Sequence, residues 1–323
     1  MSLFIWIIIF IVSLVVLIKA ADIFTENSEK LGIALGVPAF IVGLTIVSIG
    51  TSLPELATSF VSVFRGTTEI VTANAMGSNI ANVLLVIGIS AVLARMLKVE
   101  RDLINLDLPL LIASMILISF IVLDGRVVFT EAVILILAYI VYVAYTLKNK
   151  ETLEDVVTKE EVAEVSNIKQ RKRGKIKGVT IVSIIISAVF IYFGAELVIK
   201  SLINIAEVVG IGSAVIAMSA LAIGTSLPEL VVSATAVIKG KHEIGVGNIV
   251  GSNIFNTFMV IGLPGLFSTL SIDHNTLYIG LPFMIAATII FAFSGISKKI
   301  YNWEGMFYLL IFVLFIGKLF GLF

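Results

Sequence analysis

The sequence has no cysteine, and charged residues make up only 14% of its 323 positions. The absence of cysteine excludes a disulfide framework and any thiolate metal site, and it leaves the redox compartment open. The scarcity of charge, with 59% hydrophobic residues and a mean hydropathy of +1.12, excludes a soluble globular domain of this length. We therefore expect an integral membrane protein.

Histidine is almost absent as well. The two histidines, His242 and His274, both fall in predicted loops. Without a histidine pair or a cysteine, zinc and copper are disfavoured as bound metals. No nucleophile lies beside a base, which disfavours an intramembrane enzyme. We expect no enzymatic activity, no cofactor and no nucleic-acid partner.

Ten apolar runs are each long enough for a transmembrane helix, which needs roughly 20 apolar residues. Each run is expected to be helical, because backbone groups in lipid must satisfy their own hydrogen bonds. The first run has no basic leader and continues into polar helix-like sequence, so we expect a retained span and not a cleaved signal peptide. The predicted spans lie near 3–20, 39–64, 70–94, 107–123, 127–147, 178–199, 212–238, 245–267, 276–294 and 303–322.

Five predicted spans precede the polar segment 148–177 and five follow it. If the N-terminus is outside, most Lys and Arg residues of the connections fall on the cytoplasmic side, which positive residues favour. We therefore expect a multi-pass protein of the cell membrane with both termini extracellular and a cytoplasmic linker at 148–177. The linker is acidic first and then basic, as a solvated tether would be. A contact with anionic lipid headgroups or a regulatory surface is the alternative.

The hexapeptide Gly-Thr-Ser-Leu-Pro-Glu occurs twice, at 50–55 and 224–229. The same offset aligns 74–82 with 248–256 without a gap, so the register indicates a duplication. Each half has an odd number of spans, and the two copies must therefore enter the membrane from opposite sides. The predicted fold is all-α, with ten transmembrane helices in two inverted-topology five-helix repeats, 1–147 and 178–323.

Each hexapeptide combines a helix break with a carboxylate. Pro54 has no N–H for the carbonyl of Gly50, and Pro228 has none for Gly224, so both helices must kink or break there. Freed backbone oxygens in hydrocarbon need partners, and a bound cation would satisfy them. Serine and asparagine side chains extend a polar stripe from each break along the second, third, seventh and eighth spans.

The two carboxylates, Glu55 and Glu229, lie in the middle of apolar spans, and no Lys or Arg lies in mid-span to neutralise them. They must therefore be protonated or hold a cation, and an intramembrane acid is by default a functional residue. The polar side chains around them offer only oxygen. Calcium takes six to eight oxygen ligands, and two carboxylates would neutralise one calcium ion. Each serine taken singly is more typical of helix packing and hydrogen bonding between helices than of an ion site.

At these residues the chain resembles the cation/calcium antiporter superfamily, in particular the prokaryotic sodium/calcium exchangers. The resemblance rests on Gly-Thr-Ser-Leu-Pro-Glu in spans two and seven and on Gly-Ser-Asn-Ile-x-Asn in spans three and eight, and it covers the whole chain. It implies calcium bound by Glu55 and Glu229 with backbone oxygens of Thr51 and Thr225. It implies sodium in overlapping and flanking sites formed by Ser52, Ser226, Ser78 and Ser252 and by the carbonyls of Ser48 and Ala222. Spans one and six would slide across this core.

Two departures bear on the coupling ion. Some relatives, including potassium-dependent exchangers, carry aspartate at the place of Asn256, whereas this chain has Asn82 and Asn256 at the symmetric positions. That argues against potassium dependence. Proton/calcium exchangers usually read Gly-Asn-Ala-x-Glu in place of the hexapeptide, so sodium coupling is favoured over proton coupling.

The leading hypothesis is therefore a secondary antiporter that exchanges sodium for calcium by alternating access. The alternatives are a proton-coupled antiporter for calcium or another divalent cation and a passive cation channel. The expected partners are the transported cations Ca²⁺ and Na⁺ and membrane lipid. A monomer should suffice for transport, and the oligomeric state is open. Asp22 and Glu196, which are repeat partners, are expected to cap the ends of spans one and six at the membrane interface.

Overall fold

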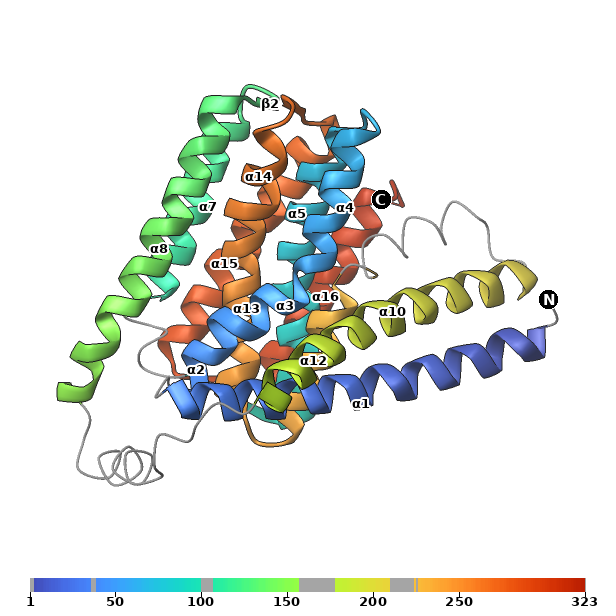
Figure 1. Cartoon of the computed structure of the whole chain (residues 1–323). Helices are drawn as coiled ribbons and strands as arrows, with labels where there is room; N and C mark the ends of the chain where they lie inside the picture. Colours follow the sequence, from blue (N-terminus) through green and yellow to red (C-terminus); the bar gives the residue numbers. More distant parts are fainter. Residues whose placement is uncertain are drawn as a thin grey trace.

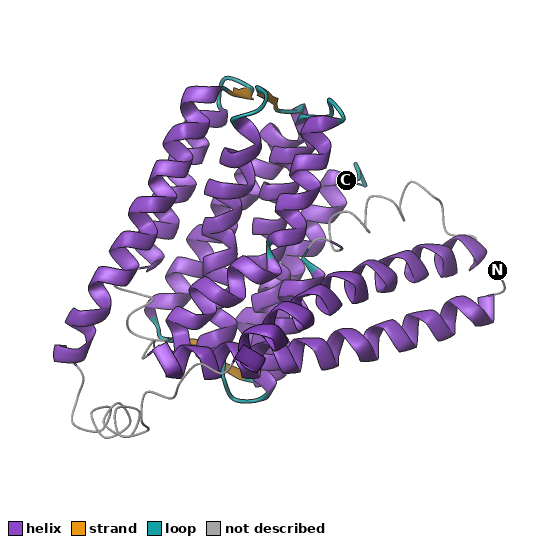
Figure 2. Ribbon diagram, viewed as in Figure 1, coloured by secondary structure: helices purple, strands orange, loops and turns teal. Residues whose placement is uncertain are grey.

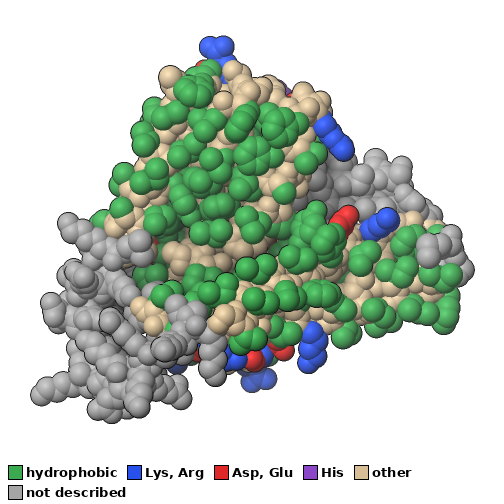
Figure 3. Space-filling view, viewed as in Figure 1, with side chains coloured by type: hydrophobic (Ala, Val, Ile, Leu, Met, Phe, Trp, Pro, Cys, Tyr) green, Lys and Arg blue, Asp and Glu red, His purple; other side chains and the backbone are tan. Residues whose placement is uncertain are grey.

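The computed structural model describes residues 3–35, 39–99, 107–156, 178–209, 224 and 226–322. These residues are almost entirely helical, which confirms an all-α membrane fold (Figure 1). Within them, seven helices are long and apolar enough to cross a membrane, or up to eight if one bent pair forms a single span. Hydrophobic side chains cover much of the outer surface of the helices (Figure 3), as lipid-facing helices require.

The helices of the first half follow the predicted spans, with different ends. The long first helix runs well beyond residue 20, and the last helix continues past residue 147 into the predicted linker. The elements are α1 Leu3–Leu35, α2 Ala39–Val42, η1 Gly43–Val47, α3 Ser48–Thr51, α4 Leu53–Phe64, α5 Glu69–Ala81, η2 Asn82–Ile87, α6 Gly88–Ala94, α7 Leu108–Val122 and α8 Phe129–Val156.

The described part of the second half repeats the order α4, α5, η2 and α6 as α12, α13, η4 and α14. The predicted seventh span is described only from Gly224 onward, with residue 225 left out, so its first part lies outside the described residues. The elements are α10 Gly178–Val209, α12 Leu227–Ile238, α13 His242–Phe255, η4 Asn256–Val260, α14 Ile261–Gly265, η5 Thr276–Gly280, α15 Leu281–Ile296 and α16 Asn302–Leu319.

Four short strands lie in the connections at the two ends of the bundle, which the sequence analysis did not predict (Figure 2). At one end, β1 (Met96–Lys98) pairs antiparallel with β4 (Lys299–Tyr301), with Met96 opposite Tyr301. At the other end, β2 (Arg126–Val127) pairs antiparallel with β3 (Leu270–Ser271). Each sheet therefore joins a connection of the first half to one of the second.

The helices form two bodies. The bundle has a large apolar core, to which α5, α7, α13, α15 and α16 contribute. α1 and α10 pack antiparallel along each other and project from the bundle (Figure 1). Their contact has its own smaller core, which includes Leu17, Phe24 and Ile191 and reaches the bundle through Val232 of α12 and Ile244 of α13.

Candidate cation site between the two helix breaks

The serines of the two hexapeptides, Ser52 and Ser226, have nearly the same backbone conformation. Ser52 lies between α3 and α4 with φ −89° and ψ 2°, and Ser226 precedes α12 with φ −87° and ψ 5°. The axes of the helical segments before and after Ser52 differ by 44°. This bend confirms the break predicted from Pro54, which has no N–H to continue the helix.

Each carboxylate lies in the first turn of the helix that begins after the break. Glu55 belongs to the first turn of α4 and Glu229 to the first turn of α12, and both side chains are fully buried. The free N–H groups and the dipole of a helix N-terminus favour negative charge. Among the described residues, the ion pairs include neither glutamate.

Glu229 of the second half is held by residues of both halves. Ser52 Oγ donates to Glu229 Oε1 at 3.0 Å, and Ser252 Oγ of α13 lies 3.5 Å from the same oxygen. The break of the first half therefore lies directly against the carboxylate of the second. The two hexapeptides, far apart in sequence, meet in one buried place.

Glu55 has the corresponding neighbours in its own half. Ser78 Oγ of α5 lies 3.5 Å from Glu55 Oε1, and Asn74 Nδ2 donates to the backbone oxygen of Glu55 at 3.3 Å. Ser78 and Ser252 are repeat partners, so each glutamate is approached by the equivalent serine of the next helix.

Thr51 joins the first break to α13. Its Oγ1 donates to Asn248 Oδ1 at 3.0 Å and lies 3.4 Å from Ser252 Oγ, which also lies 3.4 Å from the carbonyl oxygen of Ser48. Gly251 makes this approach possible, because a Cβ there would lie 2.2 Å from the carbonyl oxygen of Leu44. Helices approach this closely only where a small residue faces the partner backbone.

A second asparagine network crosses between the halves. Asn79 Nδ2 donates to Thr257 Oγ1 at 2.9 Å and to the carbonyl oxygen of Asn253 at 3.2 Å, while Asn253 Nδ2 donates to the carbonyl oxygen of Asn79 at 3.4 Å. Asn82 Nδ2 donates to Asn253 Oδ1 at 3.0 Å. Asn79 and Asn253 occupy the same position of the sequence repeat, although no role was predicted for them. Two asparagines at one repeat position are the feature that could have identified this network.

Asn82 and Asn256 each begin a π-helical segment, η2 and η4. A π-helical turn widens the hydrogen-bonding pattern of a helix and often lies at a functional site. The sequence analysis did not anticipate these segments. Both side chains are fully buried, and neither polar atom of the Asn256 side chain has a hydrogen-bond partner in the described part of the chain.

Several buried polar atoms of this region have no hydrogen-bond partner among the described residues. They are Glu55 Oε2, Glu229 Oε2, Asn82 Oδ1, Asn256 Oδ1, Asn256 Nδ2 and Ser226 Oγ. A buried oxygen without a partner is costly, and each such group in a native structure needs an explanation. All but one of these atoms are oxygens, which is the donor set that calcium and sodium prefer. The residues therefore fit a hard cation.

The structure places the predicted site residues as follows. Hydrogen bonds join Glu229, Thr51, Ser52, Ser252 and Ser48 in one buried group and Glu55 and Ser78 in a second. Asn82 belongs to the asparagine network, and the side chains of Ser226 and Asn256 are buried without hydrogen-bond partners among the described residues. Thr225 and Ala222 lie outside the described residues.

The known proteins that are similar to this chain include exchangers and an antiporter. The chain is 36% identical to the sodium/calcium exchanger MaX1 of Methanosarcina acetivorans, over 97% of each chain. It is 28% identical to the putative antiporter CaxA of Alkalimonas amylolytica, over 94% of this chain and 95% of the relative. Its fold matches a solved structure of the sodium-calcium exchanger NCX_Mj with a TM-score of 0.82 and 27% identity, over 98% of this chain and all of the other.

The sequence model of the family described as "Sodium/calcium exchanger protein" matches residues 5–148 and 179–320, in both halves of the chain. The family match and the full-length relatives agree with the resemblance that the two hexapeptides predicted. This chain belongs to the sodium/calcium exchanger protein family.

Proposed function

We propose that this chain is a secondary antiporter that exchanges sodium for calcium across the cell membrane by alternating access, and that it is not an enzyme. One observation carries the proposal. Two fully buried glutamates from opposite halves each keep one carboxylate oxygen without a partner, and no described Lys or Arg pairs with either. A buried charge without a protein partner needs a proton or a cation. The relatives named sodium/calcium exchangers support these ions as the cargo.

The two carboxylates set the charge of each loaded state. One calcium ion with two ionised glutamates is close to neutral, whereas three sodium ions would leave about one positive charge. Exchange on these terms would move net charge and would respond to membrane potential. The predicted ligands Glu55, Glu229, Thr51, Thr225, Ser52, Ser226, Ser78 and Ser252 would hold the ions, with the carbonyls of Ser48 and Ala222, and Asn82 and Asn256 would tune which ions share the site.

We propose the full architecture of ten spans in two inverted five-helix repeats, 1–147 and 178–323, with the linker 148–177 between them. Three symmetric features support it. The offset that aligns Glu55 with Glu229 also superposes η2 on η4 and β1 on β3. Gly66 and Gly240, at equivalent turns, both have φ +77°. The pairing of β1 with β4 and of β2 with β3 at opposite ends is what two inverted copies would produce.

We propose that the end with the β1–β4 sheet is cytoplasmic and that both termini are extracellular. Lys98 lies opposite Lys299 in that sheet. Basic residues favour the cytoplasmic side of a membrane. Lys239 and Lys241, in the turn between α12 and α13, therefore also lie at the cytoplasmic face.

The coupling ion is tested by radiolabelled calcium uptake into proteoliposomes under sodium, proton and potassium gradients imposed one at a time. Uptake driven by an outward sodium gradient alone would support the proposal. Uptake that follows a pH gradient and ignores sodium would instead establish the proton-coupled antiporter. Calcium flux that needs no counter-ion, with unitary currents, would establish a channel.

A further inference from the structure

Three carboxylates of α1, Asp22, Glu26 and Glu29, share one face of the helix, since spacings of four and three residues bring side chains together. Asp22 does not cap a helix end. That prediction is wrong, because α1 continues to Leu35, and α10 likewise continues beyond Glu196 to Val209.

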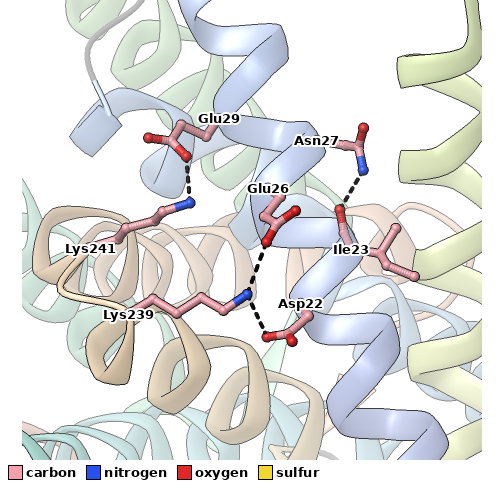
Figure 4. Close-up of polar contacts among 7 residues, drawn as sticks. All are labelled: Asp22, Ile23, Glu26, Asn27, Glu29, Lys239 and Lys241. Atoms are coloured by element: carbon pink, nitrogen blue, oxygen red, sulfur yellow. Dashed lines mark hydrogen bonds and ion pairs between the residues drawn. The ribbon is translucent and has the colours of Figure 1, made fainter.

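The three carboxylates pair with two lysines of the turn that joins α12 to α13 (Figure 4). Lys239 Nζ lies 2.9 Å from Asp22 Oδ1 and 3.1 Å from Glu26 Oε1. Lys241 Nζ lies 2.5 Å from Glu29 Oε2. The hydrogen bond to Asp22 raises the pKa of Lys239, so this side chain stays charged at neutral pH.

These ion pairs add to an apolar contact between α1 and the bundle. The smaller core of the α1–α10 pair includes Val42, Val232 and Ile244 of the bundle. Small residues line the helix–helix contacts: Ala20 and Ala21 of α1 are buried there, and a Cβ on Gly194 would lie 3.2 Å from Leu17 Cβ. Phe24 of α1 is also buried, and a Cβ on Gly50 would lie 2.6 Å from its ring, so apolar packing and the ion pairs together hold α1 at this end of the bundle.

The equivalent position at the other end has no such pair. The repeat aligns Lys239 with Arg65 and Asp22 with Glu196, and both turns have a glycine at φ +77° after the basic residue. Yet Arg65 and Glu196 are exposed, and among the described residues neither has an ion pair. Ion pairs therefore hold α1 at one end of the molecule, whereas no described ion pair joins the equivalent residues at the other end.

We infer that Lys239 and Lys241, with Asp22, Glu26 and Glu29, form a latch that holds α1 on the α12–α13 turn and keeps the cytoplasmic side of the cation site shut. In the opposite state these pairs separate and Arg65 pairs with Glu196. The inference rests on the proposed antiport and its orientation, because inverted repeats exchange their two arrangements as access alternates. The lysines are positioning residues and do not touch the ions.

Because the natural chain has no cysteine, a single introduced cysteine is the only thiol that a reagent can label. Ser28 of α1 is fully buried, and its hydroxyl has no partner among the described residues. We would place Ser28→Cys in inside-out vesicles and measure its rate of reaction with a membrane-impermeant methanethiosulfonate. Lys239→Gln with Lys241→Gln should raise this rate about tenfold, which corresponds to ~1.4 kcal/mol.

The matched control is Lys299→Gln, which removes an exposed lysine with no described ion pair from the same end of the molecule. It should leave the labelling rate unchanged. An equal rise in the control, or no rise in the double variant, overturns the latch. If the double variant fails to fold, Lys239→Asp is combined with Asp22→Lys; labelling as slow as in the natural chain supports the latch, and fast labelling overturns it.

The reciprocal pair is tested by disulfide formation between Arg65→Cys and Glu196→Cys. Oxidation should cross-link them several-fold faster when Lys239 and Lys241 are both Gln, and an unchanged rate overturns the exchange of pairs. Neither readout needs ion flux. Failure of sodium to drive calcium uptake would therefore contradict the proposed function while leaving the latch measurements interpretable.

Discussion

Ser52 donates a hydrogen bond across the two halves to Glu229, with 3.0 Å between Ser52 Oγ and Glu229 Oε1. Both side chains are fully buried. The contact ties the helix break of one repeat to the carboxylate of the other, so the two breaks form one site. In the proposed mechanism, movement of one half against the other would change this contact and would couple ion affinity to conformation.

Replacing either glutamate should abolish exchange. Glu55→Gln and Glu229→Gln each remove one of two negative charges from a site that must hold a divalent ion, so we expect sodium-dependent calcium uptake to fall at least about 100-fold. Radiolabelled uptake into proteoliposomes measures this.

The control variants are Glu69→Gln and Glu243→Gln, which are also repeat partners but lie in the first turns of α5 and α13 and are partly exposed. They should retain most of the activity. Full activity of either site variant would remove the basis of the proposed site.

Ser52→Ala should weaken calcium binding. A hydrogen bond to a charged acceptor contributes about 1.5–3 kcal/mol, so the half-saturating calcium concentration should rise about tenfold or more. Uptake measured against calcium concentration tests this. Ser62→Ala, whose hydroxyl donates only to the carbonyl oxygen of Thr58, should leave the curve unchanged.

Gly251→Ala should destabilise the protein and abolish transport. Its Cβ would lie 2.2 Å from the carbonyl oxygen of Leu44 and 2.5 Å from Ser48 Oγ, which forces α13 away from η1. Overpacking of this kind costs about 1–3 kcal/mol. Thermal unfolding in detergent should show a lower Tm. The comparison is Gly280→Ala, whose Cβ would meet its nearest described atom at 3.8 Å; equal losses of Tm in both would contradict the close-approach argument.

The two symmetric asparagines should respond differently to aspartate. Asn256→Asp breaks no described hydrogen bond, whereas Asn82→Asp replaces the Nδ2 donor to Asn253 Oδ1 with an acceptor. We expect folded, active protein from the first, with a changed sodium dependence and a new pH dependence of uptake. We expect the second to lose about 1–3 kcal/mol of stability. Equal unfolding temperatures for the two variants would contradict this difference.

By itself, the sequence determined the membrane class, the duplication and the two glutamates. Mid-span carboxylates without a basic partner carry a large desolvation penalty, and that penalty identifies Glu55 and Glu229 in any fold. The break at Ser52 was equally local, because it follows from the missing N–H of Pro54.

Only the tertiary structure determined which residues of one half contact which residues of the other. The contact of Ser52 with Glu229 and the pairing of Asn79 with Asn253 join residues of different halves, and the approach of α13 to η1 depends on packing at Gly251 and not on periodicity. Lys239 and Asp22 are a second example. They lie at the ends of different predicted spans, and only the folded position of α1 brings them together. Hydrophobic pattern and proline chemistry act within a few residues, whereas contacts between the two halves depend on the shape of the whole bundle.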